Sequence, residues 1–314
     1  MLGALIPSGD PRMGFIETFY TEFVPIFLFT VMVAMGLSLR PADLGIVLRR
    51  PKAIVSGLAA QLMMLPALGI GLGILLQSPA VIAAGAIILV ACPGGITSNA
   101  YTFASRADTA LSIGLTTIAS VITVFTIPFF TLLALDMHLD RSGVPAVPIG
   151  NMMWTLAKFT IIPVALGMTL RAWRPEWADR AIEPLRAATI VALMIVLVFG
   201  SVTAWPTIVA NIWTAGLLMT AINLCAMTLG YGLGKLLGLP FAQVAAITFE
   251  VGVQNLSLAL FVCLTFLESP DLAVASLVYA LVMKVTAFSF VWLVRSRLAE
   301  SELLQTQAEA GPPG

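Results

Sequence analysis

The sequence predicts an all-α polytopic membrane protein, and three observations carry this prediction. Of the 314 residues, 59% are hydrophobic and only 10% are charged, and the mean hydropathy is +1.01. A typical soluble domain has about 25% charged residues and about 45–50% apolar residues. The second observation is a series of apolar stretches long enough to cross a bilayer. The third is an uneven distribution of arginine and lysine among the segments that connect them.

A transmembrane helix requires about 20 mainly apolar residues. Nine stretches meet this requirement: residues 20–39, 52–77, 80–104, 108–135, 147–170, 184–204, 208–236, 241–267 and 270–294. They form a first half at 20–135 and a second half at 147–295. Residues 1–19 are then an external N-terminal segment, and the polar residues 296–314 are predicted to be a disordered cytoplasmic tail.

The loop charges predict the orientation of these spans. Basic residues gather at one end of the spans: Arg40, Arg49, Arg50, Lys52, Arg106, Arg171, Arg174, Arg180, Arg186, Arg295 and Arg297. The opposite loops contain only Arg12 and Arg141. Because cytoplasmic loops are enriched in basic residues, the N-terminus is predicted outside and the C-terminus in the cytoplasm. The net charge of zero gives no sign of a nucleic-acid partner.

The third stretch, 80–104, is interrupted near its middle. The apolar run reaches Pro93, Gly94 and Gly95, and the polar residues Ser98 and Asn99 follow. Proline removes a helical hydrogen-bond donor and glycine destabilises a helix further. Such a break is tolerated within a membrane only where it is buried in protein or lines a polar cavity.

The eighth stretch, 241–267, carries Glu250, Gln254 and Asn255 within six residues. An acidic residue at the centre of a transmembrane helix costs about 2.5–3.5 kcal/mol on insertion scales. We therefore expect this cluster to face a cation or a polar cavity.

The two interrupted stretches occupy matching positions in halves of opposite orientation. This pattern is typical of an inverted-repeat transporter with a binding site near the bilayer midplane. The halves hold four and five spans, so the first repeat lacks its first helix. A proline kink and a structurally paired carboxylate are the simpler interpretations of each feature taken alone.

Three segments resemble the bile acid:sodium symporter family: "GLSLRPADLGIVLRRPKAIVSGLAAQLMMLP", "CPGGITSNAYTFASRADTALSIGLTT" and "GLPFAQVAAITFEVGVQNLSLAL". The resemblance covers residues from about 34 to 295. It implies two inverted repeats arranged as a panel domain and a core domain, with two discontinuous helices crossing in the core. It also implies a bacterial inner-membrane location and no enzymatic activity.

The resemblance further implies two sodium sites. The first would use Ser98, Asn99, Ser112, Thr116 and Glu250. The second would use Gln61, Glu250, Gln254 and the backbone carbonyls near Val251 and Val253. Oxygen ligands of this kind suit a hard cation.

An organic anion is the substrate that the resemblance implies, either a bile acid or a small carboxylate. Backbone N–H groups near Ile96, Thr97 and Asn255 would bind it at the ends of the half-helices. Lys284 departs from the family pattern, because a neutral polar residue is expected there. It is either a counter-charge for the substrate or a partner of Glu250.

Two other functions stay open at this point. A proton-coupled carrier or exporter could use Glu250 with Lys284 on the same fold. An intramembrane enzyme or sensor is the more distant alternative, since only one carboxylate lies centrally in a span. The sequence sets neither the substrate nor the oligomeric state.

Overall fold

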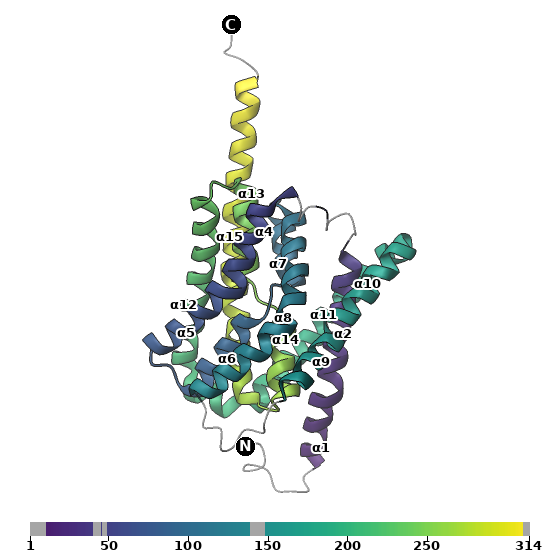
Figure 1. Cartoon of the computed structure of the whole chain (residues 1–314), viewed down its shortest axis with the longest axis vertical. Coiled ribbons are helices and arrows are strands. Elements are labelled where there is room, and N and C mark those ends of the chain that lie inside the picture. Colours follow the sequence, from purple (N-terminus) through teal and green to yellow (C-terminus); the bar gives the residue numbers. More distant parts are fainter. Residues whose placement is uncertain (1–10, 40–44, 46–48, 139–147, 310–314) are drawn as a thin grey trace.

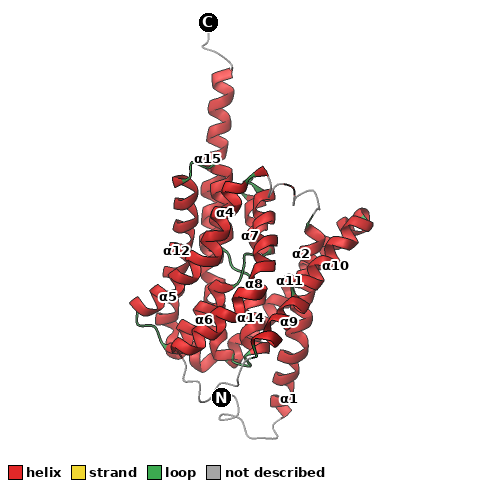
Figure 2. Cartoon of the chain, viewed as in Figure 1, coloured by secondary structure: helices red, strands yellow, loops and turns green. Residues whose placement is uncertain are grey.

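The computed structural model describes residues 11–39, 45, 49–138 and 148–309. Within these residues the chain is a bundle of helices without a β-strand (Figures 1 and 2). Seven helical stretches are long and apolar enough to cross a membrane. They are Gly14–Ser38, Pro51–Leu75, Thr109–His138, Ile149–Trp173, Pro175–Thr203, Trp205–Leu236 and Pro270–Ala299.

These stretches consist of the following elements: α1 (Pro11–Thr18), the π-helical turn η2 (Phe19–Phe23), α2 (Val24–Ser38), α4 (Pro51–Ala59), the π-helical turn η3 (Ala60–Met64), α5 (Leu65–Leu75), α8 (Thr109–His138), α9 (Ile149–Phe159), α10 (Ile161–Trp173), α11 (Pro175–Thr203), α12 (Trp205–Leu236) and α15 (Pro270–Glu309).

Two further apolar stretches are interrupted, as the sequence predicts. The first consists of α6 (Ala80–Ala91) and α7 (Ile96–Ala104), and the second of α13 (Phe241–Gly252), α14 (Leu256–Phe261) and the π-helical turn η5 (Val262–Phe266). The prediction of an all-α membrane protein with several spans is therefore confirmed. Seven of the nine predicted spans are continuous enough to meet the length criterion alone.

The helices form two packed groups. In the first group, α2 lies against α9, α10 and α11. In the second, α6 packs on α8 and α15, while α12 packs on α13 and α15. Figure 1 shows α2, α10 and α11 at the right of the bundle and α12, α4 and α15 at the left. The half-helices α7 and α13 contact each other within the second group.

Glycines allow the closest approach within the first group. A Cβ at Gly36 of α2 would overlap the backbone of Val164 on α10, and a Cβ at Gly167 would overlap the backbone of α2. Arg171 of α10 donates to the carbonyl of Leu37 at 2.6 Å. This contact fixes the end of α2 against α10.

Two boundaries differ from the predictions. Helix α11 begins at Pro175, nine residues before the predicted 184, because proline suits the first helical turn and no breaker follows until Pro184. Arg180 and Arg186 therefore lie on a helix and not in a loop.

The predicted disordered tail is also wrong as far as Glu309, since α15 continues to that residue and projects from the bundle. Helix-forming residues fill this stretch, and the first glycine comes at Gly311.

Gly36→Ala tests the close packing of α2 on α10. The added Cβ meets backbone atoms, which cannot rotate away, so we expect a loss of about 1–3 kcal/mol in stability. The midpoint of thermal unfolding in detergent should fall. Gly71→Ala is the matched control, because a Cβ at Gly71 meets no atom within 4 Å. An equal change in both variants would contradict this packing.

Candidate functional site

The two interruptions meet and hydrogen-bond to each other. Helix α6 ends at Ala91, just before Cys92 and Pro93, and α13 ends at Gly252. The Asn255 N–H donates to the Pro93 carbonyl at 2.9 Å, and Gly94 pairs with Gln254 in an antiparallel bridge. The two breaks thus satisfy part of each other's backbone at the point where both chains leave the helical conformation.

Glu250 lies at this crossing and is completely buried. Its carboxylate accepts hydrogen bonds from Ser98 Oγ at 2.9 Å and Thr116 Oγ1 at 2.7 Å. Ser112 Oγ lies 3.3 Å from the same carboxylate and 2.8 Å from Asn99 Oδ1. All five residues predicted for the first sodium site therefore lie in one buried cluster.

The sequence produces this cluster through local spacing. Ser112 and Thr116 are four residues apart on α8, so both side chains point from one face of that helix. Ser98 and Asn99 lie in the first turn of α7, directly after the break. A Cβ at Gly94 would overlap the Glu250 carboxylate, so only glycine fits beside it.

The second predicted group is also buried but is connected differently. Gln61 Nε2 donates to Gln254 Oε1 at 3.0 Å, and Gln254 Nε2 donates to the Val251 carbonyl at 2.7 Å. Gln61 lies in the π-helical turn η3, a distortion that is frequent at functional sites. Among the described hydrogen bonds, Glu250 belongs to the first group only, whereas the prediction assigned it to both. The Val253 N–H bonds to Phe249 at 2.9 Å within its own helix end.

The atoms present fit a hard cation. Hydroxyl, carboxylate and amide oxygens surround Glu250, and Gln61 Oε1 is a buried acceptor without a hydrogen-bond donor in the described structure. Buried polar atoms of this kind are normally paired, so an orphaned oxygen suggests a missing partner. A sodium ion is the kind of partner that these oxygens prefer.

The sequence analysis did not identify the residues that hydrogen-bond to the backbone carbonyls at the two helix breaks. The Gly252 carbonyl accepts from Asn223 Nδ2 and from the Tyr279 hydroxyl, both at 2.9 Å. The Cys92 carbonyl accepts from Gln61 at 2.8 Å. Asn223 was detectable as an uncharged polar residue within an apolar span, whereas the part played by a backbone carbonyl has no sequence signal.

The predicted substrate residues are not all equivalent. Ile96 and Thr97 are half-buried in the first turn of α7. Asn255 caps α14 by accepting from the Leu258 N–H at 3.2 Å, and its own N–H already donates to Pro93. The N–H of Asn255 therefore already has an acceptor in this conformation, whereas the sequence analysis expected it to bind the substrate anion.

A small crevice opens beside Ile96, between the two packed groups. Its volume is about 10 Å³, and it is lined by Ile96 together with Ala34, Ser38, Ile182 and Arg186. Arg186 is paired with Glu183 one helical turn away, at 2.8 Å. This arginine, assigned from sequence to a loop, thus brings a positive charge to the first turn of α7.

Lys284 lies on α15 and is half-buried. It follows Leu277 by seven residues, which places both on one face of the helix. Leu277 lies against Gly200 of α11, 3.6 Å from the position of an added Cβ. Leu281 and Phe288, one turn before and one turn after Lys284, are 71% and 72% exposed, so the other helices leave this part of the face uncovered. Neither Lys284 nor Glu250 has an ion-pair partner among the described side chains.

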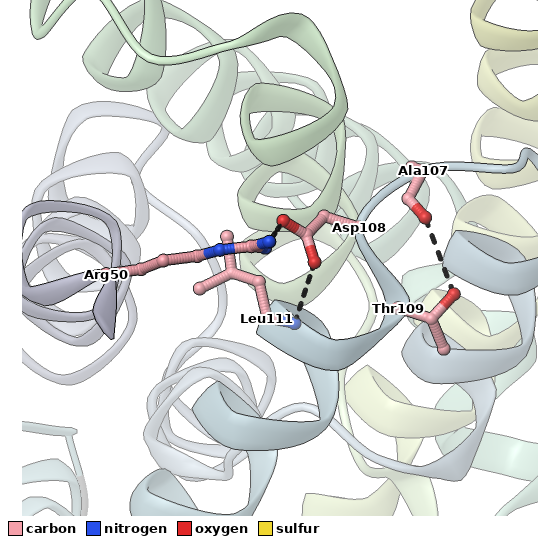
Figure 3. Close-up of polar contacts among 5 residues, drawn as sticks. All are labelled: Arg50, Ala107, Asp108, Thr109 and Leu111. Carbon is pink, nitrogen blue, oxygen red and sulfur yellow. Dashed lines mark hydrogen bonds and ion pairs between the residues drawn. The ribbon is translucent and has the colours of Figure 1, made fainter. Parts of the chain in front are cut away.

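A polar tie closes the arginine-rich end of this region. Figure 3 shows Asp108 between Arg50 of the α4 end and the Leu111 N–H of α8. The Asp108 N–H donates to the Ala242 carbonyl at 3.2 Å. Because Ser112 follows Asp108 by one turn of α8, this tie holds the near end of the Glu250 cluster.

Comparison with known proteins gives a consistent result. Residues 25–211 match the model of the Sodium Bile acid symporter family. This match includes α7 and the whole of α8, and it ends before Glu250.

Three relatives show the range of similarity. A Bacillus subtilis (strain 168) protein named as the sodium-dependent transporter YocS is 30% identical over 81% of this chain and 75% of its own length. A rice chloroplastic protein named as a probable sodium/metabolite cotransporter, BASS2, is 26% identical over 90% of this chain and 66% of its own. The human ileal sodium/bile acid cotransporter is 27% identical over 74% of this chain and 66% of its own.

The polar crossing of two interrupted helices and these similarities agree with each other. The chain belongs to the sodium bile acid symporter family and is a membrane transporter, not an enzyme.

Proposed function

We propose that this protein is a secondary active transporter that couples the entry of sodium to the symport of an organic anion by alternating access. The observation that carries the proposal is Glu250, a fully buried carboxylate surrounded by oxygen groups and without a cationic partner among the described side chains. A buried carboxylate is costly unless a cation compensates it. The names of the relatives, all sodium-dependent, support sodium as that cation.

Two sodium sites follow from the two polar groups. The first ion would bind among Glu250, Ser98, Asn99, Ser112 and Thr116. The second would bind Gln61 Oε1, Gln254 and the carbonyls near Val251 and Val253, with Glu250 turning toward it when both ions are present. Sodium is a transported ion in this proposal. Its binding replaces hydrogen bonds that the oxygen atoms of the two polar groups make with one another in this structure.

The substrate is an organic anion, either a bile acid or a small carboxylate. It would bind beside the first turn of α7, where Ile96 and Thr97 present the positive end of the helix. Arg186 across the crevice and Lys284 on α15 add positive charge from two other helices. Asn255 would take part through its side chain, since its N–H is bonded to Pro93.

The arrangement of the helices supports the rest of this proposal. We assign α2, α9, α10 and α11 to a panel domain and the other long helices to a core domain. Two inverted repeats together contain the nine spans. Arg50, Asp108, Lys235 and Arg297 lie at one end of the core, linked through contacts with Ala242 or Phe241. With basic residues inside, the C-terminus lies in the cytoplasm of a bacterium and the N-terminus outside.

A proton-coupled carrier is the second candidate, and Lys284 is the observation behind it. Lys284 is a half-buried amine within a span, without an ion-pair partner among the described side chains. Among the described residues no hydrogen bond or ion pair joins Lys284 to Glu250, and this favours sodium over a proton as the coupled ion.

Glu250→Gln tests sodium coupling. The amide keeps the size of the side chain but loses its charge, and breaking a buried ion pair costs about 3–5 kcal/mol. We expect the apparent affinity for sodium to fall by at least about 100-fold. Sodium chloride should raise the unfolding temperature of the purified wild type above its value in potassium chloride, and this difference should vanish in the variant.

The sodium-dependent change in unfolding temperature can be measured without knowing the substrate. Uptake of taurocholate and of a panel of radiolabelled small carboxylates into proteoliposomes then tests transport. Equal uptake with and without sodium, together with flux driven by a pH gradient alone, would favour the proton-coupled alternative.

Gly94→Ala tests the geometry of the crossing. The added methyl group would overlap the Glu250 carboxylate, so we expect the sodium-dependent rise in unfolding temperature to be largely lost. Gly95→Ala is the matched control, because its Cβ would only touch Asn255 at 3.4 Å, an ordinary contact. The prediction fails if both variants respond to sodium as the wild type does.

Lys284→Gln and Arg186→Gln test the anion site. Each should raise the KM for the transported anion by about 5- to 100-fold, the range expected when a charged hydrogen bond worth about 1–3 kcal/mol is lost. The sodium-dependent stabilisation should persist in both. Lys158→Gln is the control, since Lys158 is an exposed lysine on α9 that does not line the crevice. A KM unchanged in both variants would exclude these two residues from the site.

A further inference from the structure

An apolar groove lies on the outside of the bundle, where α5 and the turn η3 meet α12. Its volume is about 490 Å³. Met64 and Leu68 line one wall, and Leu224, Thr228, Gly232 and Leu236 line the other. Figure 1 shows α5 and α12 side by side at the left edge of the molecule, away from the crevice beside Ile96.

The groove covers the depth of one leaflet. Its wall on α12 runs from Leu224 to Leu236, a separation of twelve positions that spans ~18 Å at 1.5 Å per residue. Half of a ~30 Å hydrocarbon core is ~15 Å. Leu236 is the last residue of α12 and lies at the arginine-rich end, so the groove runs from that surface to about the midplane.

A positive charge marks the surface end of the groove. Lys235 is exposed and follows Thr228 by seven residues, so both lie along the same edge of α12. Its ammonium group lies 5.9 Å from the Tyr231 ring and 5.5 Å from the Phe241 ring. The Arg297 guanidinium lies 5.8 Å from the same Phe241 ring. Lys235 has no ion pair with any carboxylate whose side chain the structure describes.

These features favour one occupant over the others. A second copy or a partner helix would be expected to contact both leaflets, whereas this groove ends near the midplane. An apolar channel one leaflet deep with cations at its surface end matches a phospholipid. Unfilled space between α5 and α12 would leave their side chains without packing partners, which a flexible acyl chain can supply.

We propose that this groove is a binding site for an anionic phospholipid of the leaflet at the arginine-rich end. One acyl chain lies along Gly232 and Thr228 toward Met64, and the phosphate lies beside Lys235. The site is separate from the transport site and does not depend on which ion or anion is transported.

Blocking the groove tests the acyl-chain contact. A Cβ at Gly232 meets no protein atom within 4 Å and Gly232 lines the groove, so we expect Gly232→Phe to place its ring in the groove. Gly216→Phe is the matched control, because Gly216 also lies on α12 with nothing within 4 Å and does not line the groove. The full chain is delipidated in detergent, titrated with phosphatidylglycerol and observed by native mass spectrometry. We expect Gly232→Phe to lose one tightly bound lipid that the wild type and Gly216→Phe retain.

Removing the charge tests headgroup selection. The wild type should bind phosphatidylglycerol about fivefold more tightly than phosphatidylcholine of the same acyl chains, the preference that one lysine near an anionic surface supplies. Lys235→Gln should lose this preference, and Lys158→Gln should keep it. The unfolding temperature of Lys235→Gln should equal that of the wild type, which shows that the variant is folded when it loses the headgroup preference.

Cys225 reports whether the lipid binds at this place. It lines the groove and is exposed, whereas Cys92 and Cys263 are buried. Phosphatidylglycerol should slow the modification of this thiol by N-ethylmaleimide at least about threefold, since an acyl chain in the groove covers it. Equal binding by Gly232→Phe and Gly216→Phe, no headgroup preference in the wild type, or a dimer that Gly232→Phe dissociates would each overturn the proposal.

Discussion

Glu250 must be compensated, because a carboxylate with no exposed surface has given up its hydration. Three hydroxyl groups supply part of this compensation, and they come from α7 and α8, which surround the crossing. For those hydroxyls to reach it, α6 must end early and α7 must restart beside it. The break at Pro93 and the absence of a side chain at Gly94 are therefore consequences of one buried charge. A pair of kinks without such a charge would not require this arrangement.

The crossing also connects the two halves of the chain. The bond from Asn255 to Pro93 joins the break in one half to the break in the other, and Gln61 holds both through Cys92 and Gln254. Motion of one interrupted helix without the other would break these buried bonds. The contacts of α2 with α10 and α11 form a second close-packed unit, which meets the first through α14 and α15 and leaves a small crevice beside Ile96. Any rearrangement that moves the two groups against each other thus leaves the polar crossing intact.

Much of this site was predictable because polar residues are rare within apolar spans. Ser98, Asn99 and Glu250 stood out for that reason, and the family resemblance added Ser112, Thr116 and Gln61. Asn223 and Tyr279 were missed, since their contribution is to hold a backbone carbonyl that becomes free only when α13 ends at Gly252. The start of α11 was placed too late, because a charged amphipathic turn before an apolar span is indistinguishable from a loop by hydropathy. The surroundings of Lys284 were not predictable either, because the exposure of its neighbours Leu281 and Phe288 depends on how α15 packs.

Charge balance connects these residues into one constraint on coupling. In the proposed transporter, one carboxylate with two sodium ions would carry a net charge of plus one, and a monoanionic substrate would make the loaded site neutral. Neutrality matters because each uncompensated charge moved through a low-dielectric interior costs several kcal/mol. Lys284 and Arg186 change this sum when they face the substrate, although Arg186 is neutralised by Glu183 while the two are paired. If a charged Lys284 contacts the substrate, neutrality requires either a dianionic substrate or a single sodium ion. The charge of the substrate and the number of coupled ions are therefore linked in the proposed transporter.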